Sequence, residues 1–216
     1  MRWSSDRSKF PMVELPDEKL AVHLLPVSKL QFERFLAEPV VDLQQASPMY
    51  GDGWYESLLA VLPRVTLVDA SVETYESQFL GGVLPNEVDG FARWLGKGFE
   101  LPRVESWRKI DDVLNEEPLT DTDAEALMND ERLCRSARSL LAWWISARQP
   151  RTWGELAGLH GGLLEWVKIG PKSFGGLGRP RHGFRSILIN PQRDEPVRPI
   201  QQRRLAYFGF RLIVPL

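Results

Sequence analysis

A run of basic side chains near the end of the chain is the first feature that could do chemistry. Guanidinium and ammonium groups bind carboxylates and phosphates through charge-assisted hydrogen bonds, and neighbouring aromatic rings supply contact area. Because glycines and prolines punctuate the stretch 168–205, we expect an exposed loop surface there that recognises an acidic protein patch or a phosphate group. The predicted ligand-binding residues are Lys172, Phe174, Arg179, Arg181, His182, Arg185 and Arg193.

The charges divide along the chain. The formal net charge is −2, but the segment 171–216 carries +7 and the segment 1–170 carries −9. Nine acidic residues and no basic ones lie within 111–131. Two interpretations stay open: the basic end attracts an anionic ligand, or the two halves neutralise each other across an internal interface.

The residue types that usually perform catalysis are sparse. The histidines, His23, His160 and His182, lie in different segments without metal-ligand spacing. No phosphate-binding loop, nucleophile elbow or zinc-protease motif is present, and the acidic stretch 111–131 lacks the spacing of a calcium loop. We therefore predict no catalytic residue, no metal site and no cofactor.

Two single residues could still be reactive. Cys134 is the only cysteine, and we expect it to be buried and inert because a reactive thiol needs a neighbour that lowers its pKa. Glu165 is the only carboxylate in an otherwise apolar segment. It could act as a general acid, but we expect it to accept backbone hydrogen bonds and fix a turn.

Length and composition indicate one soluble domain. The chain has 216 residues, of which 43% are hydrophobic and 26% charged. One cysteine cannot form an intramolecular disulfide, and no stretch reaches the ~18–20 apolar residues of a membrane span. The N-terminal segment also lacks the apolar core of a signal peptide. These features predict a cytoplasmic protein, and most of its eight tryptophans are expected in the core.

Periodicity and capping residues outline the elements that must position these groups. Ser28 and Gln31 form a capping box at the start of an amphipathic helix. A further helix is expected over 86–95, capped by Asn86 and stopped by Gly96, and another after Pro102. One long helix is expected over 121–147, and the glycines of 175–178 are expected in a flexible loop. Strands are expected within 12–25 around a turn at 16–18, and at 61–70, 163–169, 184–189 and 205–215.

Five short segments follow one another in order along the chain. They read LPVSKLQFERFL (25–36), LPRVESW (101–107), LHGGLLEWV (159–167), FGGLGR (174–179) and FGFRLI (208–213). Together they resemble the formylglycine-generating enzyme and sulfatase-modifying-factor family. The resemblance implies an α+β, C-type-lectin-like fold with short strands, a few helices, much irregular loop and paired N- and C-terminal strands. We expect one such domain over 1–216, with a helical insertion over 111–148.

The departures from the family pattern bear on function. In the family's enzymes two cysteines bind copper, and the corresponding positions fall near Pro180 and Arg185, which are not thiolate ligands. The asparagine that helps to hold calcium corresponds to Gly162. The resemblance therefore implies the family's framework without its known chemistry.

The resulting hypothesis is a non-catalytic binding or accessory protein of a bacterial regulatory, secretion or defence system, with an acidic or phosphorylated protein as partner. The alternative is a metal-dependent oxidoreductase of altered chemistry in the same superfamily. Nucleic-acid binding is disfavoured, because strong phosphate-backbone binders carry a net basic charge and this chain has a pI near 6.0.

Overall fold

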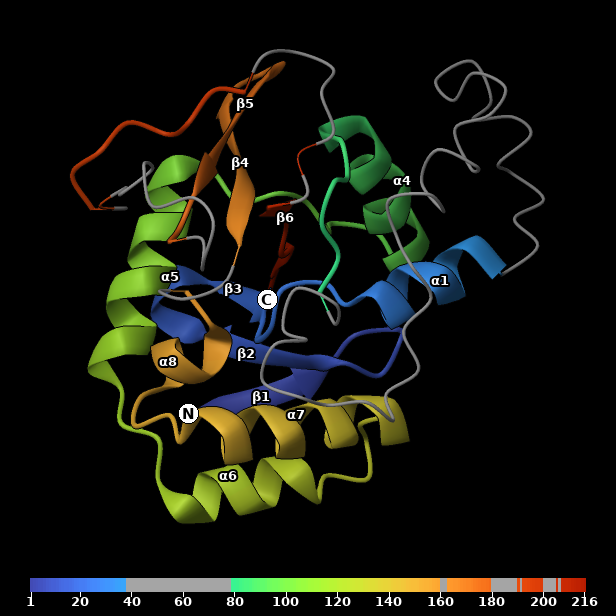
Figure 1. The fold of residues 1–216 in the computed structure, drawn as a ribbon, viewed down its shortest axis with the longest axis vertical. Coiled ribbons are helices and arrows are strands. Elements are labelled where there is room, and N and C mark those ends of the chain that lie inside the picture. The colour runs from blue at the N-terminus through green and yellow to red at the C-terminus, as the bar shows by residue number, and fades with distance from the viewer. Residues whose placement is uncertain (38–78, 160–162, 180–189, 191, 200–204, 206) are drawn as a thin grey trace.

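The protein has a mixed α+β fold in which two small sheets are surrounded by helices (Figure 1). The computed structural model describes residues 1–37, 79–159, 163–179, 190, 192–199, 205 and 207–216. The strands expected at 61–70 and 184–189 lie outside the described residues. In the described part of the chain no helix is both long and apolar enough to cross a bilayer.

The first sheet joins the N-terminal strands to the last strand of the chain. All its neighbours are antiparallel, in the order β1-β2-β3-β7. The predicted turn is a short 3-10 helix, η1, after which Lys19 adopts a left-handed φ of 54°. Pairing of N- and C-terminal strands agrees with the expectation, whereas β1 was not predicted. The elements are β1 (Arg2–Ser5), β2 (Pro11–Leu15), η1 (Pro16–Glu18), β3 (Leu20–His23) and β7 (Ile213–Pro215).

The second sheet divides the hydrophobic interior into two clusters. Alternate residues of a strand point to opposite faces, so Val167 joins one cluster while Leu164 and Trp166 join the other. The first cluster extends to the first sheet and to the helices that follow residue 104, and the second lies against α1 and α4. The strands, in the order β5-β4-β6, are β4 (Leu164–Gly170), β5 (Ser173–Leu177) and β6 (Phe208–Gly209).

Side chains close in sequence set the start of the first two helices. The Ser28–Gln31 capping box is confirmed: the Gln31 side chain accepts the Ser28 N–H at 2.9 Å, and the Ser28 hydroxyl accepts the Gln31 N–H at 3.2 Å. The cap assigned to Asn86 is wrong, because α4 begins one residue earlier and Glu87 instead accepts the N–H of Leu84 at 2.8 Å. The helices are α1 (Lys29–Ala37), α4 (Pro85–Leu95) and α5 (Val104–Glu116).

The single long helix expected over 121–147 is wrong: the segment forms a helical hairpin. Thr120 caps the first helix in a capping box with Asp123. In the connection, Asp130 accepts the backbone N–H of Arg132 at 2.9 Å and the indole N–H of Trp3 at 2.8 Å. These bonds hold a turn where helix would otherwise continue. The elements are α6 (Asp121–Met128), α7 (Arg135–Arg148) and, after a short turn, α8 (Trp153–Ala157).

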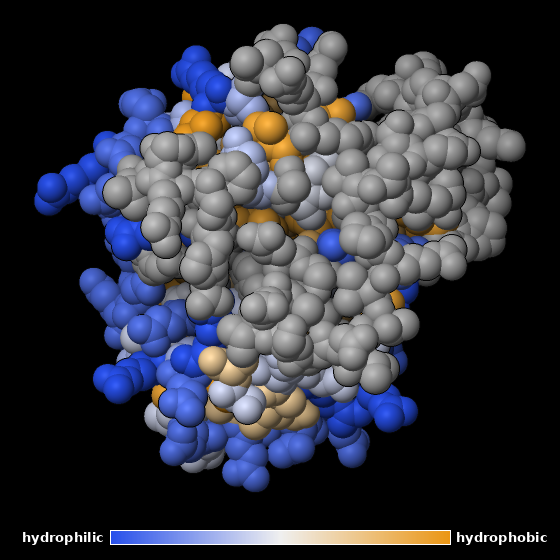
Figure 2. Space-filling model, viewed as in Figure 1, coloured by the Kyte–Doolittle hydropathy of each residue, from blue (hydrophilic) through white to orange (hydrophobic). Residues whose placement is uncertain are grey.

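The helices shield the apolar interior from solvent on the acidic side of the chain. Buried members of the first cluster come from both helices of the hairpin, among them Leu127, Leu141 and Trp144. Hydrophilic side chains cover the left flank and lower end of the view, over α5 and α6 (Figure 2). Apart from the buried Asp111, the acidic run is therefore a solvated face over a packed interior.

Asp130 gives the stability of the hairpin a defined dependence on pH. Its hydrogen bonds from Arg132, opposed by partial burial and reinforced by the Trp3 N–H, lower its pKa from 3.8 to about 2. A depressed carboxyl pKa stabilises the fold above the unfolded pKa, and this contribution is lost as the pH falls through the folded value. We predict that Asp130→Asn lowers the urea midpoint at neutral pH, and that the difference from wild type shrinks between about pH 5 and pH 2.

The matched control is Glu125→Gln, on an exposed position of the same hairpin, whose urea midpoint should track wild type at neutral pH. A difference between Asp130→Asn and wild type that does not change with pH would contradict the role given to the Asp130 carboxylate.

Candidate functional site

The predicted binding residues that the structure describes lie on or beside the β4–β5 hairpin. Lys168 of β4 pairs with Phe174 of β5, and the register shifts by a bulge between Lys168 and Gly170. Pro171 and Lys172 form the turn, where both are exposed. The hairpin thus carries Lys172 out at its tip, beyond the end of the sheet (Figure 1).

A second segment, 192–198, is fastened along the outer edge of β5. Gly176 and Val197 exchange two backbone hydrogen bonds, of 2.8 and 3.0 Å. The Arg108 guanidinium of α5 donates to the carbonyl of Asp194 at 2.9 Å, and the Gln192 amide donates to Asp111 at 3.0 Å. The segment is therefore held by the strand on one side and by α5 on the other.

The glycines of this region are required by packing. We predicted that they make a flexible loop, which is wrong: Gly175 and Gly176 lie buried within β5. A Cβ at Gly175 would approach Ile169 to 2.7 Å and Pro196 to 2.8 Å, which leaves no room for a side chain. Gly178 has a φ of +122° and lies against the carbonyl of Leu163. The glycines let the 192–198 segment approach the strand closely.

The structure describes four of the seven predicted binding residues. Lys172, Arg179 and Arg193 are exposed, and their side chains make no hydrogen bond or ion pair with the described residues. Phe174 is half-buried and packs against the second hydrophobic cluster. Arg181, His182 and Arg185 lie outside the described residues.

The exposed basic groups follow the edge of β5 and do not converge on one point. Lys172 precedes the strand and Arg179 lies two residues past its end, so about 20 Å of extended chain separates them. Arg193 lies on the segment fastened beside them. The arrangement is a basic strip, defined here as Lys172, Arg179, Arg193 and Arg198, suited to an extended anionic partner.

Other charged groups near the hairpin were missed as site residues. Arg198 is exposed next to Val197, and only the non-local pairing of Val197 with Gly176 brings it there. Arg103 is exposed beside Lys168, which pairs with Glu100 at 2.6 Å. Sequence alone gave no signal for either neighbour, since both depend on contacts between distant segments.

The pKa of Asp89 reflects both its burial and the positive charge of nearby Lys168. Partial burial raises the pKa of Asp89, and the positive charges of Lys168 and Arg93 oppose that rise. This side of the hairpin is therefore mixed in charge, and along β5 the basic strip itself has Asp194 and Glu195 between Arg193 and Arg198.

Among the described residues one ion pair, Arg211 with Glu165, joins the two halves of the chain, and the basic strip takes no part in it. In the acidic run, Asp130 pairs with Arg132, and Glu117 lies 3.7 Å from the amino group of Met1. Among the residues that the structure describes, no ion pair joins the acidic run to the basic strip. Internal neutralisation therefore applies to Arg211, and the described residues provide no internal ion-pair partner for the basic strip.

A buried polar network lies behind the hairpin. Arg211 is fully buried and donates bidentately to Glu165, at 2.6 Å from Nε and 2.6 Å from Nη2. Its remaining N–H groups bind the carbonyls of Ala157 at 2.8 Å, Leu24 at 3.1 Å and His23 at 3.3 Å. All five donors of the guanidinium are used.

Glu165 accepts three hydrogen bonds in this network. Besides Arg211, it accepts the indole N–H of Trp107 at 3.0 Å. The expectation that Glu165 binds backbone N–H groups and fixes a turn is wrong, because its partners are side chains from α5 and the C-terminal segment. Three residues from separate sequence motifs thus form one buried cluster that no local pattern predicts.

A second buried network links the N-terminal strands. Nε2 of His23 lies 3.2 Å from Oδ2 of Asp6 without hydrogen-bond alignment, while the hydroxyl of Ser8 donates to Asp6 at 2.7 Å. Burial favours a higher Asp6 pKa, but the neighbouring His23, Ser8 and the Phe10 N–H outweigh it and lower that pKa. Gln31 also donates to Asp6 at 3.2 Å. His23 is thereby placed in a structural network.

The thiol of Cys134 is only partly buried, contrary to expectation. It precedes α7, and the Arg34 guanidinium donates to Sγ at 3.4 Å and to the carbonyl of Ser8 at 3.2 Å. Within the described ranges, no group of three or more His, Cys, Asp or Glu side chains is arranged to hold a metal ion.

Comparisons with known proteins give no independent guide to this site. No model of a known protein family matches the chain, and no curated protein is significantly similar to it.

The Glu165–Arg211 pair sets a testable stability requirement. Arg211→Met leaves Glu165 buried without its counter-charge, so we predict a loss of about 3–5 kcal/mol in the free energy of unfolding. Urea denaturation of Arg211→Met, Glu165→Leu and the double variant measures the coupling, and the double variant should be less destabilised than the sum of the two singles.

Lys168→Met is the control, because its ion pair with Glu100 is solvent-exposed and should contribute less than about 1 kcal/mol. Additive effects of the Glu165 and Arg211 substitutions would show that the pair is not coupled.

Proposed function

We propose that the protein is a non-catalytic binding or accessory protein that recognises an acidic or phosphorylated protein partner through the basic strip along β5. The observation that carries the proposal is the exposure of Lys172, Arg179 and Arg193 without ion-pair partners among the described residues. Unpaired guanidinium and ammonium groups on a fixed edge can bind carboxylate or phosphate groups without first breaking an internal pair.

The fastening of the strip supports recognition of a defined partner. The 192–198 segment is held to Gly176 and Arg108, so Arg193 and Arg198 sit on constrained backbone. A constrained surface loses less conformational entropy on binding than a free loop. Half-buried Phe174 adds apolar contact beside Lys172.

We further propose that the scaffold is a divergent formylglycine-generating-enzyme-like domain of the C-type-lectin type. The proposal rests on the ordered motifs of the sequence, and two observations support it. The N- and C-terminal strands pair, and Trp107, Glu165 and Arg211, each from a different motif, meet in one buried cluster. The motif residues thereby have structural roles that require no catalysis.

The bacterial regulatory, secretion or defence context follows from the same resemblance, whereas the cytoplasmic location follows from the single cysteine. We place it in the cytoplasm of a bacterial cell, in a regulatory, secretion or defence system. A metal-dependent oxidoreductase of altered chemistry is the runner-up and rests on the resemblance alone. Nucleic acid is the less suitable anion, because the chain is acidic overall and nine carboxylate residues lie within 111–131.

The basic strip can be tested with synthetic anionic peptides. The triple variant Lys172→Ala, Arg179→Ala, Arg193→Ala should bind a labelled hexaglutamate or phosphoserine-rich peptide about tenfold more weakly than wild type, which corresponds to ~1.4 kcal/mol. Fluorescence anisotropy at low and high salt measures the loss, and the difference should shrink at high salt because the charges are exposed.

The control removes the same charge elsewhere, with Arg2→Ala, Lys97→Ala and Arg135→Ala at exposed positions. If this triple variant loses as much affinity as the first, the interaction reflects net charge and the strip is not a site. Failure of either peptide to bind wild type would also count against the proposal.

A further inference from the structure

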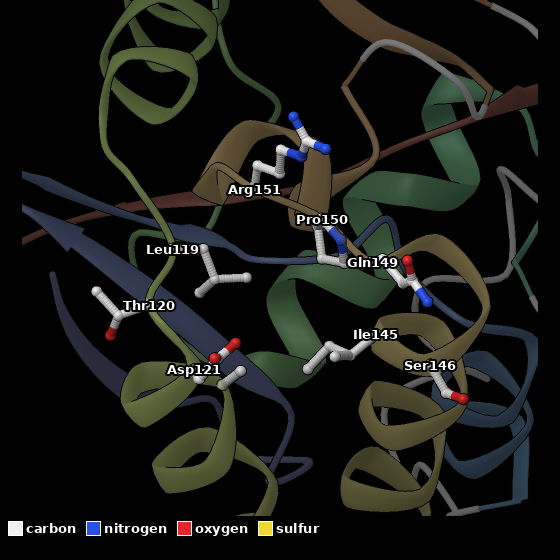
Figure 3. A pocket seen from close by; sticks show the side chains of 9 residues that line it. Leu119, Thr120, Asp121, Ile145, Ser146, Gln149, Pro150 and Arg151 are labelled. Atoms are coloured by element: carbon white, nitrogen blue, oxygen red, sulfur yellow. The ribbon is translucent and has the colours of Figure 1, made fainter.

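A pocket of about 560 Å³ lies at the mouth of the α6–α7 hairpin, far along the molecule from the tip of the β4–β5 hairpin (Figures 1 and 3). Its walls come from the start of α6, the last turn of α7 and the turn 149–151. Ligand sites of small molecules typically occupy ~300–1,000 Å³, so the size suits a small ligand.

The backbone around the pocket is held in place by hydrogen bonds. The N–H of Leu119 donates to the carbonyl of Arg151 at 2.9 Å, beside an isolated bridge between Pro118 and Thr152. Thr120 is fixed by its capping box, and Gln149 ends α7 in a left-handed conformation with φ 48°. The pocket is therefore preorganised and does not depend on a loop closing over it.

The lining combines an apolar floor with two opposite charges. Leu119 and Pro150 lie between Asp121 and Arg151, and Ile145 lies across the pocket from Asp121 (Figure 3). Neither charged side chain makes a hydrogen bond or ion pair with the described residues, and the two do not pair with each other. Separated, unpaired charges across an apolar floor are complementary to a molecule with both charges and an apolar body.

We propose that this pocket binds a small zwitterion, namely a free aliphatic amino acid or a dipeptide. The Asp121 carboxylate points into the space between Leu119 and Ile145, where it would accept the ligand's ammonium group (Figure 3). Arg151 would bind the carboxylate, and the apolar side chain would rest on the floor. This site is separate from the basic strip and does not depend on the proposed function.

Binding requires one rearrangement. The Arg151 guanidinium lies at the rim and points away from α6, so it must turn toward the ligand (Figure 3). Because the side chain is exposed and unpaired, the turn breaks no ion pair and costs only rotamer freedom. Affinity should therefore be modest, in the micromolar to millimolar range.

The probes are leucine, leucyl-leucine and two blocked forms of leucine. N-acetyl-leucine lacks the ammonium group, and leucinamide lacks the carboxylate. Titration followed by NMR should give shifts confined to 119–124 and 145–151, with each blocked form bound about tenfold more weakly. Asp121→Asn should weaken leucine binding but should not further weaken N-acetyl-leucine binding, because that ligand has no ammonium group. Arg151→Gln should weaken leucine binding but should not further weaken leucinamide binding, because that ligand has no carboxylate. Whichever of leucine and leucyl-leucine binds more tightly identifies the length of the ligand.

Three further variants separate binding from folding. Ala124→Leu fills the pocket without removing a charge and should abolish binding, while Glu125→Gln and Arg135→Gln, exposed outside the pocket, should leave it unchanged. The proposal is overturned if neither leucine nor leucyl-leucine shifts the pocket resonances of wild type. It is also overturned if the blocked forms bind as tightly as leucine.

Discussion

The rest of the structure depends on the buried, bidentate pair of Glu165 and Arg211. Placing two charges in an apolar interior is costly, and the cost is offset only when every donor and acceptor is satisfied. Here the satisfaction comes from elements that share no local sequence: β4 supplies Glu165, α5 supplies Trp107, and the ends of β3 and α8 supply carbonyls. Each element is therefore held in place by the requirement that neither member of the Glu165–Arg211 pair lose a partner.

Features encoded by neighbouring residues could be predicted from the sequence. The capping box of Ser28 and Gln31 is local, and so is the periodicity of the helix after Pro102. The break in the long helix was not predictable, because Asp130 holds the turn partly through Trp3, more than a hundred residues away. The strand role of the glycines was missed for the same reason, since the atoms that exclude a side chain at Gly175 belong to other segments.

The candidate site was predictable in composition and unpredictable in arrangement. The excess of arginines near the C-terminus is plain in the sequence. However, Arg211 is fully buried and all its donors are used in the core, whereas Arg198 is exposed on the 192–198 segment. Charge counting cannot separate these two roles. The burial and the ion pairs of each arginine distinguish them. The exposed charges that remain form the basic strip on one part of the surface and line a pocket of mixed charge on another.

The pairing of β3 with β7 has a consequence for how the chain acquires its structure. Val22 and Ile213 are opposite each other in the sheet although almost the whole chain separates them. Loops of that length close late, and contacts between distant segments slow folding. During synthesis the N-terminal strands emerge long before their last neighbour, and Glu165 emerges before Arg211. The buried carboxylate of Glu165 and the open edge of β3 both await residues 211–215, so native packing is completed only after that segment has emerged from the ribosome.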